Sequence, residues 1–195
     1  MCFSFFKSNN NNNNNQSNNN PAPVIKTNSN SNSQTFQFGG IPSSLGEFQS
    51  LPEASLDTPF KAAALTVLAL CAFVNNKEAS FEMLDFLRGP RPLSNMDKSF
   101  LKDRFMDNGK YIPFSYFEGA TPDNDYTPAQ PLRLTIKSDV HSYENDGYCR
   151  LNLRSGGADS PRQIVLRKLG DGTWRLWDQF VMVGIRDPKS QNPWA

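Results

Sequence analysis

The order of the sequence patterns predicts an α+β fold, in which a layer of about three helices packs on an antiparallel sheet of about four strands. Three helix-like segments come first, between residues 59 and 108. Four strand-like runs follow between residues 132 and 183, and Gly170-Asp171-Gly172 between the last two is typical of a tight hairpin. Helices followed by a run of strands favour α+β over a parallel α/β fold.

The composition of residues 1–55 predicts a disordered tail and linker. Residues 9–20 are almost entirely Asn, and residues 27–35 repeat a mixture of Asn, Ser and Gln. Such a segment buries too little apolar surface to offset the entropy lost when a chain becomes ordered. Residues 56–195 are richer in apolar and aromatic side chains, and they are long enough to form a single α+β domain with its own core.

The first predicted helix has a clear start. In Asp57-Thr58-Pro59, a polar residue that can cap a helix precedes a proline, which is favoured in the first turn. Residues 62–74 are apolar on nearly all sides of a helix. A helix of this kind is buried on most of its faces, so we expect it to lie at the centre of the core.

Two shorter helices are expected next. The second lies near residues 79–87 and is stopped by Gly89-Pro90. Before the third helix, Ser94 and Asp97 have the spacing of a capping box, and Asn108-Gly109 ends the apolar pattern. After a proline-rich loop, residues 132–137 and 149–154 alternate apolar and polar side chains, which is the pattern of half-buried strands.

The polar positions of these strands form the first candidate interaction surface. It consists of Arg133, Lys137, Arg150 and Arg154, to which Arg167 and Arg175 are candidate additions. Adjacent antiparallel strands would gather the side chains into one cationic face, suited to an acidic partner, a phosphate or a nucleic acid. The alternative is an ordinary solvated face with charge pairs to Asp146, Asp159 or Asp178. Aromatic residues do not alternate with these arginines along the strands, so the nucleic-acid signal is weak.

The loop between helices and strands supplies the remaining candidates for contact, which are Tyr116, Glu118, Asp125 and Tyr126. Asp123-Asn124-Asp125 presents two carboxylates, but the later ligands of a calcium loop are missing, and Asx residues between prolines usually form turns. We therefore predict no metal site and no cofactor.

No catalytic constellation stands out. The one histidine, His141, would need a Ser or Cys149 as nucleophile and Asp139 as orienting group, and no local motif supports that arrangement. We therefore expect a histidine in a surface turn, and a protein without enzymatic activity. Trp174 and Trp177 fall on opposite faces of a strand, and whichever is exposed would be a partner anchor unless the terminal Pro193-Trp194 covers it.

Charge and targeting signals predict a cytoplasmic protein. The net charge of +1 gives no attraction of the whole protein for nucleic acid or anionic lipid. The three cysteines are far apart and lack the spacing of a zinc site or a disulfide framework. The chain shows neither a secretory signal nor an apolar run long enough for a transmembrane segment. Phe3, Phe5 and Phe6 near the amino terminus suit docking to a partner or weak peripheral membrane contact.

Residues 56–195 also carry short motifs that resemble those of a family of uncharacterised bacterial domains, mainly from Firmicutes. These motifs are Thr58-Pro59 with Ala64-Leu-Thr66, Phe86-Leu-Arg-Gly-Pro90, Tyr116-Phe-Glu-Gly-Ala-Thr-Pro122, Tyr126-Thr-Pro128, Gly157-Ala-Asp-Ser-Pro161, Trp174-Arg-Leu-Trp177 and Pro193-Trp-Ala195. The resemblance implies a bacterial source and a domain of unknown function. It implies no activity, and no functional residue follows from it.

The function expected from these observations is that of a cytoplasmic, non-catalytic protein-interaction module on a flexible Asn-rich linker, whose partner is an unidentified protein. The alternative is a domain that binds or hydrolyses a small molecule in a pocket between the first helix and the sheet. That pocket would use Tyr116, Glu118, Asp125 or His141. A deep pocket in which these side chains converge favours the alternative, and a solid core beneath an arginine-bearing sheet favours the module.

Overall fold

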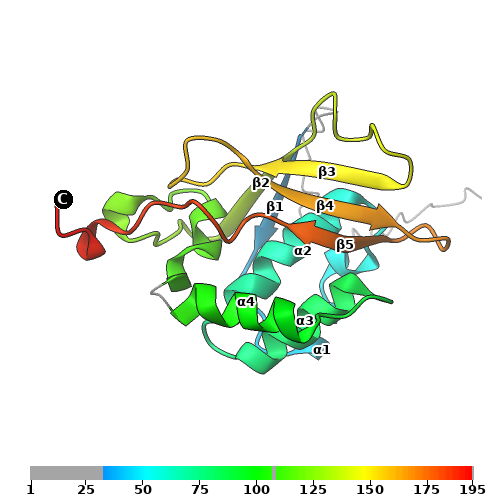
Figure 1. The fold of residues 1–195 in the computed structure, drawn as a ribbon, viewed down its shortest axis with the longest axis horizontal. Coiled ribbons are helices and arrows are strands. Elements are labelled where there is room, and N and C mark those ends of the chain that lie inside the picture. Colours follow the sequence, from blue (N-terminus) through cyan, green and yellow to red (C-terminus); the bar gives the residue numbers. More distant parts are fainter. Residues whose placement is uncertain (1–32, 107–108, 195) are drawn as a thin grey trace, which may run out of the picture.

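The computed structural model describes residues 33–106 and 109–194, which form a five-stranded antiparallel sheet with helices on one face (Figure 1). The strands follow one another in sequence order across the sheet. They are β1 (Ser33–Phe38), β2 (Leu132–Lys137), β3 (Tyr148–Leu153), β4 (Arg162–Lys168) and β5 (Trp174–Gln179). The α+β class is confirmed, and the sheet has one strand more than predicted.

The additional strand, β1, lies in the segment that was expected to be a disordered linker. It pairs antiparallel with β2 over six residues, from Ser33 opposite Lys137 to Phe38 opposite Leu132. Phe38 is buried, whereas Thr35 and Gln37 are exposed, so the strand has an apolar face and a polar face. The composition of the surrounding tract obscured this alternation, and the partner strand lies about 100 residues further along the chain.

The predicted domain boundary at Leu56 is therefore wrong, because the preceding segment is part of the fold. Helix α1 (Leu45–Gln49) and the 3₁₀ helix η1 (Pro52–Ser55) follow β1. Phe48 of α1 is fully buried and packs edge-on against the ring of Phe86, with 6.2 Å between the ring centroids. The tail expected over residues 1–32 lies outside the described residues, together with its three phenylalanines.

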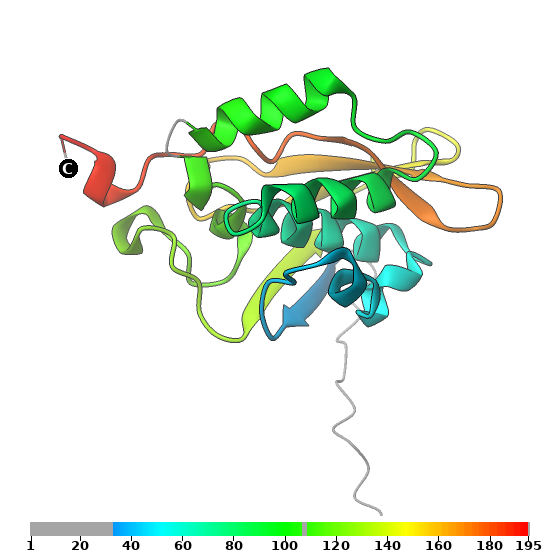
Figure 2. The same ribbon diagram turned by 90° about the horizontal axis from the view of Figure 1, so that it is seen from below.

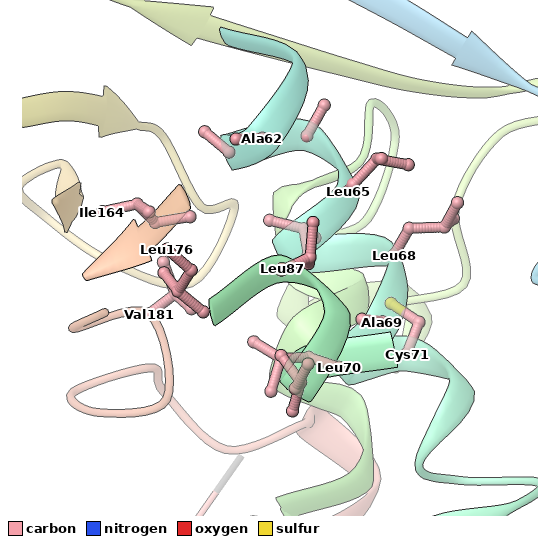
Figure 3. Packing of buried hydrophobic residues seen from close by; sticks show 14 of the residues in the cluster. Ala62, Leu65, Leu68, Ala69, Leu70, Cys71, Leu87, Ile164, Leu176 and Val181 are labelled. Atoms are coloured by element: carbon pink, nitrogen blue, oxygen red, sulfur yellow. The ribbon is translucent and has the colours of Figure 1, made fainter. Parts of the chain in front are cut away.

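Helix α2 (Pro59–Ala72) forms the centre of the core. Its start is as predicted, since the Thr58 hydroxyl accepts a hydrogen bond from the backbone N–H of Lys61 at 3.3 Å. Every residue from 62 to 72 is buried, and the hydroxyl of Thr66 is satisfied within the helix. Figure 3 shows α2 packed between α3 and the sheet, with the labelled partners Leu87, Ile164, Leu176 and Val181.

Helices α3 (Lys77–Arg88) and α4 (Asn95–Met106) complete the helical layer, which covers one face of the sheet (Figure 2). The capping box before α4 is confirmed. The backbone N–H of Ser94 donates to the Asp97 carboxylate at 2.8 Å, and the N–H of Asp97 donates to the Ser94 hydroxyl at 3.1 Å. Leu101 and Phe105 of α4 are buried, but Met96 is 83% exposed, so the apolar side chains of this helix are covered only in part.

Strands β2 and β3 meet only at their ends. Their pairing consists of Ile136 with Leu153 and Lys137 with Asn152, after which the two strands diverge. The segment around Phe117 takes the place of β3 there, pairing with Leu134 through an isolated bridge. Short 3₁₀ helices flank this segment at Gly109–Tyr111, Pro113–Tyr116 and Pro122–Asn124. Another 3₁₀ helix, Lys189–Gln191, lies near the carboxy terminus.

Candidate functional site

The divergence of β2 and β3 separates the predicted cationic residues into two groups. Lys137 and Arg154 flank the point where the two strands part, and Arg133 lies four residues further back on β2. Arg150 lies on β3 in the other direction, with Arg167 on the neighbouring strand. A rise of about 3.3 Å per residue along a strand puts the two groups at different places on the exposed side of the sheet.

Arg175 does not join either group. Its guanidinium donates a 3.0 Å hydrogen bond to the carbonyl oxygen of Phe86 and lies over the Phe86 ring, so it ties β5 to the end of α3. Its Nε is buried without a hydrogen-bond partner among the described residues. Arg175 therefore has a packing role between the sheet and the helical layer.

The other predicted cations of the sheet have no carboxylate partner within the described part of the chain. Among residues 33–106 and 109–194, no ion pair within 4.0 Å includes any of five basic residues, namely Arg133, Lys137, Arg150, Arg154 and Arg167. Asp159, one of the expected charge partners, pairs instead with Arg186 at 2.7 Å. These five basic side chains are thus available to bind a partner molecule.

A second feature of the exposed sheet face is a set of stacked side chains, which we call the Trp177 cluster (Arg91, Tyr148, Arg167 and Trp177). The Arg91 guanidinium lies 4.0 Å from the centroid of the Trp177 ring and donates to the Trp177 carbonyl oxygen. Arg167 lies 5.0 Å from the same ring and 5.1 Å from that of Tyr148. The two rings meet edge-on, with their centroids 5.5 Å apart. These contacts hold the cluster in one arrangement.

The Trp177 cluster borders a small hollow of about 90 Å³, whose lining includes His141, Arg150 and Val165. His141 lies in an exposed turn, as predicted, and its Nδ1 contacts the carboxylate of Glu144. That contact raises the pKa of His141 above its usual value of 6.5. The hollow therefore adds an imidazole whose pKa is raised to a surface that already carries arginines.

A larger hollow, the β2–β3 pocket, opens where those two strands diverge. It has a volume of about 450 Å³. Its charged lining residues are Glu118, Lys137 and Arg154, and its neutral polar ones include Thr135 and Asn152. Three of the candidates predicted from the sequence, Lys137 and Arg154 from the strand region and Glu118 from the loop, thus line the same pocket.

The other candidates from the loop are buried or form hydrogen bonds to other segments of the chain. Tyr116 also lines the β2–β3 pocket, but its hydroxyl donates a 2.7 Å hydrogen bond to the carbonyl oxygen of Val181, and burial raises the pKa of this phenol. Tyr126 is 2% exposed. Asp125 accepts a hydrogen bond from the backbone N–H of Ser190 at 3.2 Å. Tyr116, Asp125 and His141 therefore do not converge in a pocket between the first helix and the sheet.

A third hollow, of about 430 Å³, lies between α4 and β5 and is mostly apolar. It reaches Leu70 of α2, and Met96, Phe100 and Phe180 stand at its exposed side. Trp194 is 93% exposed and does not cover the sheet, contrary to the clamp expected at Pro193-Trp194. In the described ranges, no cluster of three or more His, Cys, Asp or Glu side chains could hold a metal ion.

The sequence did not reveal the role of Arg91 or the contact between Tyr148 and Trp177. Arg91 lies in the connection between α3 and α4, far from β5 along the chain. Tyr148 and Trp177 lie on strands that are not neighbours in the sheet, with β4 between them. The alternation of β3 could have placed Tyr148 on the face of Arg150, two residues away.

Comparisons with known proteins identify a domain family of unknown function. The family model of a domain of unknown function, DUF6935, matches residues 40–189. It begins before Leu56, in line with the folded segment that precedes α2. No curated protein and no solved structure matches the chain. The bacterial source stays a prediction. None of the helices described is long and apolar enough to cross a membrane.

Proposed function

Since the chain belongs to the DUF6935 family, a domain of unknown function, its activity has to be argued from its own surface, and we propose that it is a non-catalytic protein-interaction module. Its partner is a protein segment rich in acidic residues. The contact surface is the exposed face of β3, β4 and β5 around the Trp177 cluster. Arg150 and the hollow beside it complete that surface.

The observation that supports this proposal is the concentration of Trp, Tyr and Arg on one open face of the sheet. These residue types contribute most to binding in protein interfaces, because they offer large contact areas and several hydrogen-bond donors. Arg150 and Arg167 have no carboxylate partner within 4.0 Å among the described residues. An acidic segment would supply the missing charges, and unpaired arginines would also speed its association.

The aromatic rings favour a protein segment over single-stranded nucleic acid. Bases bind to open ring faces, whereas the Trp177 ring already has Arg91 at 4.0 Å and Arg167 at 5.0 Å from its centroid. Carboxylates can still bind both guanidinium groups, because a guanidinium has five N–H donors and the bond from Arg91 to the Trp177 carbonyl oxygen leaves others available. An acidic peptide therefore suits this surface better than a base does.

The proposal includes a cytoplasmic location and a flexible attachment. Both described cysteines, Cys71 and Cys149, are free and buried, as is usual in a reducing compartment. The Asn-rich composition of residues 9–20 supports a linker, and the apolar residues before it support a second contact point. Cell fractionation of the full chain tests the location.

Selection from a random peptide library tests the binding, with the full chain as bait. We expect acidic peptides to be enriched, and their affinity to fall as salt is raised. Reversing one charge with Arg167→Glu should weaken the enriched peptides at least about tenfold, since hydrogen bonds to a charged group contribute about 1.5–3 kcal/mol. Arg133→Glu is the matched control, because Arg133 is equally unpaired but lies away from the Trp177 cluster.

The proposal fails if the enriched peptides are neutral or basic, or if Arg133→Glu weakens binding as much as Arg167→Glu does. It also fails if a single-stranded oligonucleotide binds and Arg167→Glu abolishes that binding while acidic peptides remain inactive. Thermal unfolding of each variant shows whether a loss of binding is a loss of folding. A variant that unfolds early is replaced by Arg150→Glu.

A further inference from the structure

We propose that the β2–β3 pocket binds a small carboxylate that also carries an amino or hydroxyl group, such as a free amino acid or a hydroxy acid. This pocket lies apart from the Trp177 cluster. Its occupation does not depend on the acidic partner proposed above. The inference follows from the origin of the pocket, its charges, its fixed polar groups and its rigid wall.

The pocket exists because two strands separate without leaving their backbone groups unpaired. Beyond Ile136 and Leu153, β2 no longer pairs with the chain that continues from β3. The backbone N–H of Glu118 donates to the carbonyl oxygen of Arg133 at 2.9 Å, so the loop takes over the pairing of β2. The space between this loop and the end of β3 stays open. Its volume of about 450 Å³ falls in the range of roughly 300–1,000 Å³ that is typical of small-molecule sites.

The charges around the pocket are of both signs and are not neutralised by one another. Lys137 and Arg154 line it together with Glu118. In the described part of the chain, none of the three takes part in an ion pair within 4.0 Å. A ligand carboxylate would bind the two cations, and a hydrogen-bond donor elsewhere on the ligand would bind the Glu118 carboxylate.

Two neutral polar side chains of the lining already have partners within the protein. The Asn152 amide donates to Asp139 at 2.6 Å and accepts from Gln163 at 3.2 Å. The hydroxyls of Thr135 and Thr35 are 2.8 Å apart. These bonds hold the side chains in fixed positions, and they leave the charged groups as the main contacts for a ligand.

The wall opposite the strands is closely packed. A Cβ atom on Gly156 would lie 2.0 Å from the carbonyl oxygen of Ala120, so the two backbones approach as only glycine permits. The N–H of Gly156 donates to the carbonyl oxygen of Ser115 at 2.9 Å, and the hydroxyls of Ser115 and Ser155 are 2.8 Å apart. A wall fixed in this way costs little ordering entropy when a ligand binds.

Amide NMR titration of the full chain tests the inference with four probes: L-serine, L-lactate, propionate and inorganic phosphate. We expect L-serine and L-lactate to shift the amide signals of Ala120 and Gly156 in a saturable way. Propionate should bind more weakly, because it offers nothing to Glu118. Lys137→Met and Arg154→Met should each weaken L-serine about tenfold or more, from the loss of a hydrogen bond to a charged group.

Two further variants test whether binding depends on the pocket and on the Glu118 carboxylate. Arg133→Met is the matched control, since Arg133 is an exposed cation of the same strand that does not line the pocket, and it should leave L-serine binding unchanged. Glu118→Gln should reduce the preference for L-serine over propionate while propionate still binds. The unfolding temperature of each variant is measured alongside the titration.

Three outcomes overturn the inference. The first is the absence of a saturable shift with any of the probes. The second is equal loss of binding in Arg133→Met and Arg154→Met, which would mean that general surface charge attracts the anions. The third is tighter binding of phosphate than of L-serine, which would make the pocket a simple anion site. None of these results bears on the acidic partner, which is tested through Arg167.

Discussion

The phenol of Tyr126 donates a 2.7 Å hydrogen bond to the carbonyl oxygen of Arg186, and this bond joins the central loop to the carboxy-terminal segment. The Tyr126 ring is stacked on that of Tyr111 with 4.9 Å between centroids. The N–H of Arg186 donates to the carbonyl oxygen of Gly157 at 2.9 Å. Segments that are distant in the sequence are thus fixed together near the β2–β3 pocket.

Replacing Tyr126 with Phe should lower the free energy of unfolding by about 1–2 kcal/mol, because the carbonyl oxygen of Arg186 would lose the hydrogen bond from this hydroxyl. Urea denaturation followed by circular dichroism measures the change. Tyr143→Phe serves as the control, since Tyr143 is 54% exposed and water can replace its contacts. Equal effects of the two substitutions would contradict the role assigned to Tyr126.

Replacing Gly157 with Ala should destabilise the same junction. The added methyl group would lie 1.9 Å from the Tyr126 hydroxyl oxygen, which is far inside contact distance. Overpacking of this kind costs about 1–3 kcal/mol. Gly170→Ala is the matched control, because a Cβ there has no atom within 4 Å. Thermal unfolding compares the two variants, and an unchanged midpoint for Gly157→Ala would show that Tyr126 can move aside.

Replacing Leu68 with Ala should cost about 2–5 kcal/mol, the usual range when a leucine is truncated in a packed core. Leu68 is fully buried at the centre of α2. The exposed apolar residue Val140 provides the comparison, since it is 88% exposed and its truncation should change stability little. Chemical denaturation measures both. A small loss for Leu68→Ala would mean that α2 is less central to the core than its burial indicates.

The protonation of His141 should follow its contact with Glu144. The contact raises the pKa of His141 above 6.5, so the imidazole should stay charged to a higher pH than in an unfolded chain. Its stabilising effect is complete below pH 6.5 and disappears as the pH rises through the raised pKa. The chain contains one histidine, so its ring protons can be titrated by NMR without assignment.

Glu144→Gln should bring that titration midpoint back toward 6.5, because the carboxylate is the main cause of the shift. Asp146→Asn, a change of the same kind in the same turn, should leave the midpoint in place. A wild-type midpoint at or below 6.5 would be incompatible with the contact between His141 and Glu144.

Local patterns were sufficient to predict α2, α3, α4 and the strands β2–β5, with ends shifted by a few residues. Thr58-Pro59 and the Ser94–Asp97 capping box act within one helical turn, so neighbouring residues determine their effect. The tight turn at Gly170-Asp171-Gly172 likewise joins β4 to β5. Strand β1 was missed, because its apolar residues stand in an Asn-rich tract and its hydrogen-bond partner is distant in the sequence.

The candidate site depended far more on tertiary structure. The alternation of β2 and β3 correctly placed Arg133, Lys137 and Arg150 on polar positions. It could not show that β2 and β3 share only two residue pairs, which divides the cations and opens the pocket. Nor could it show that Arg91 would reach Trp177 from the helical layer.

The sequence by itself determined the α+β class, the buried central helix, the four later strands and membership of a family without an assigned activity. The structural properties depend on residue periodicity, caps and turns, which act over a few positions, whereas the family was indicated by a resemblance of short motifs. The tertiary structure alone decided how the charged side chains are grouped. Strand register and divergence bring Lys137, Arg154 and Glu118 to one pocket and stack Arg91 and Arg167 on Trp177. Contacts between distant segments leave no local pattern in the sequence, because their geometry arises only when the sheet and helices pack together.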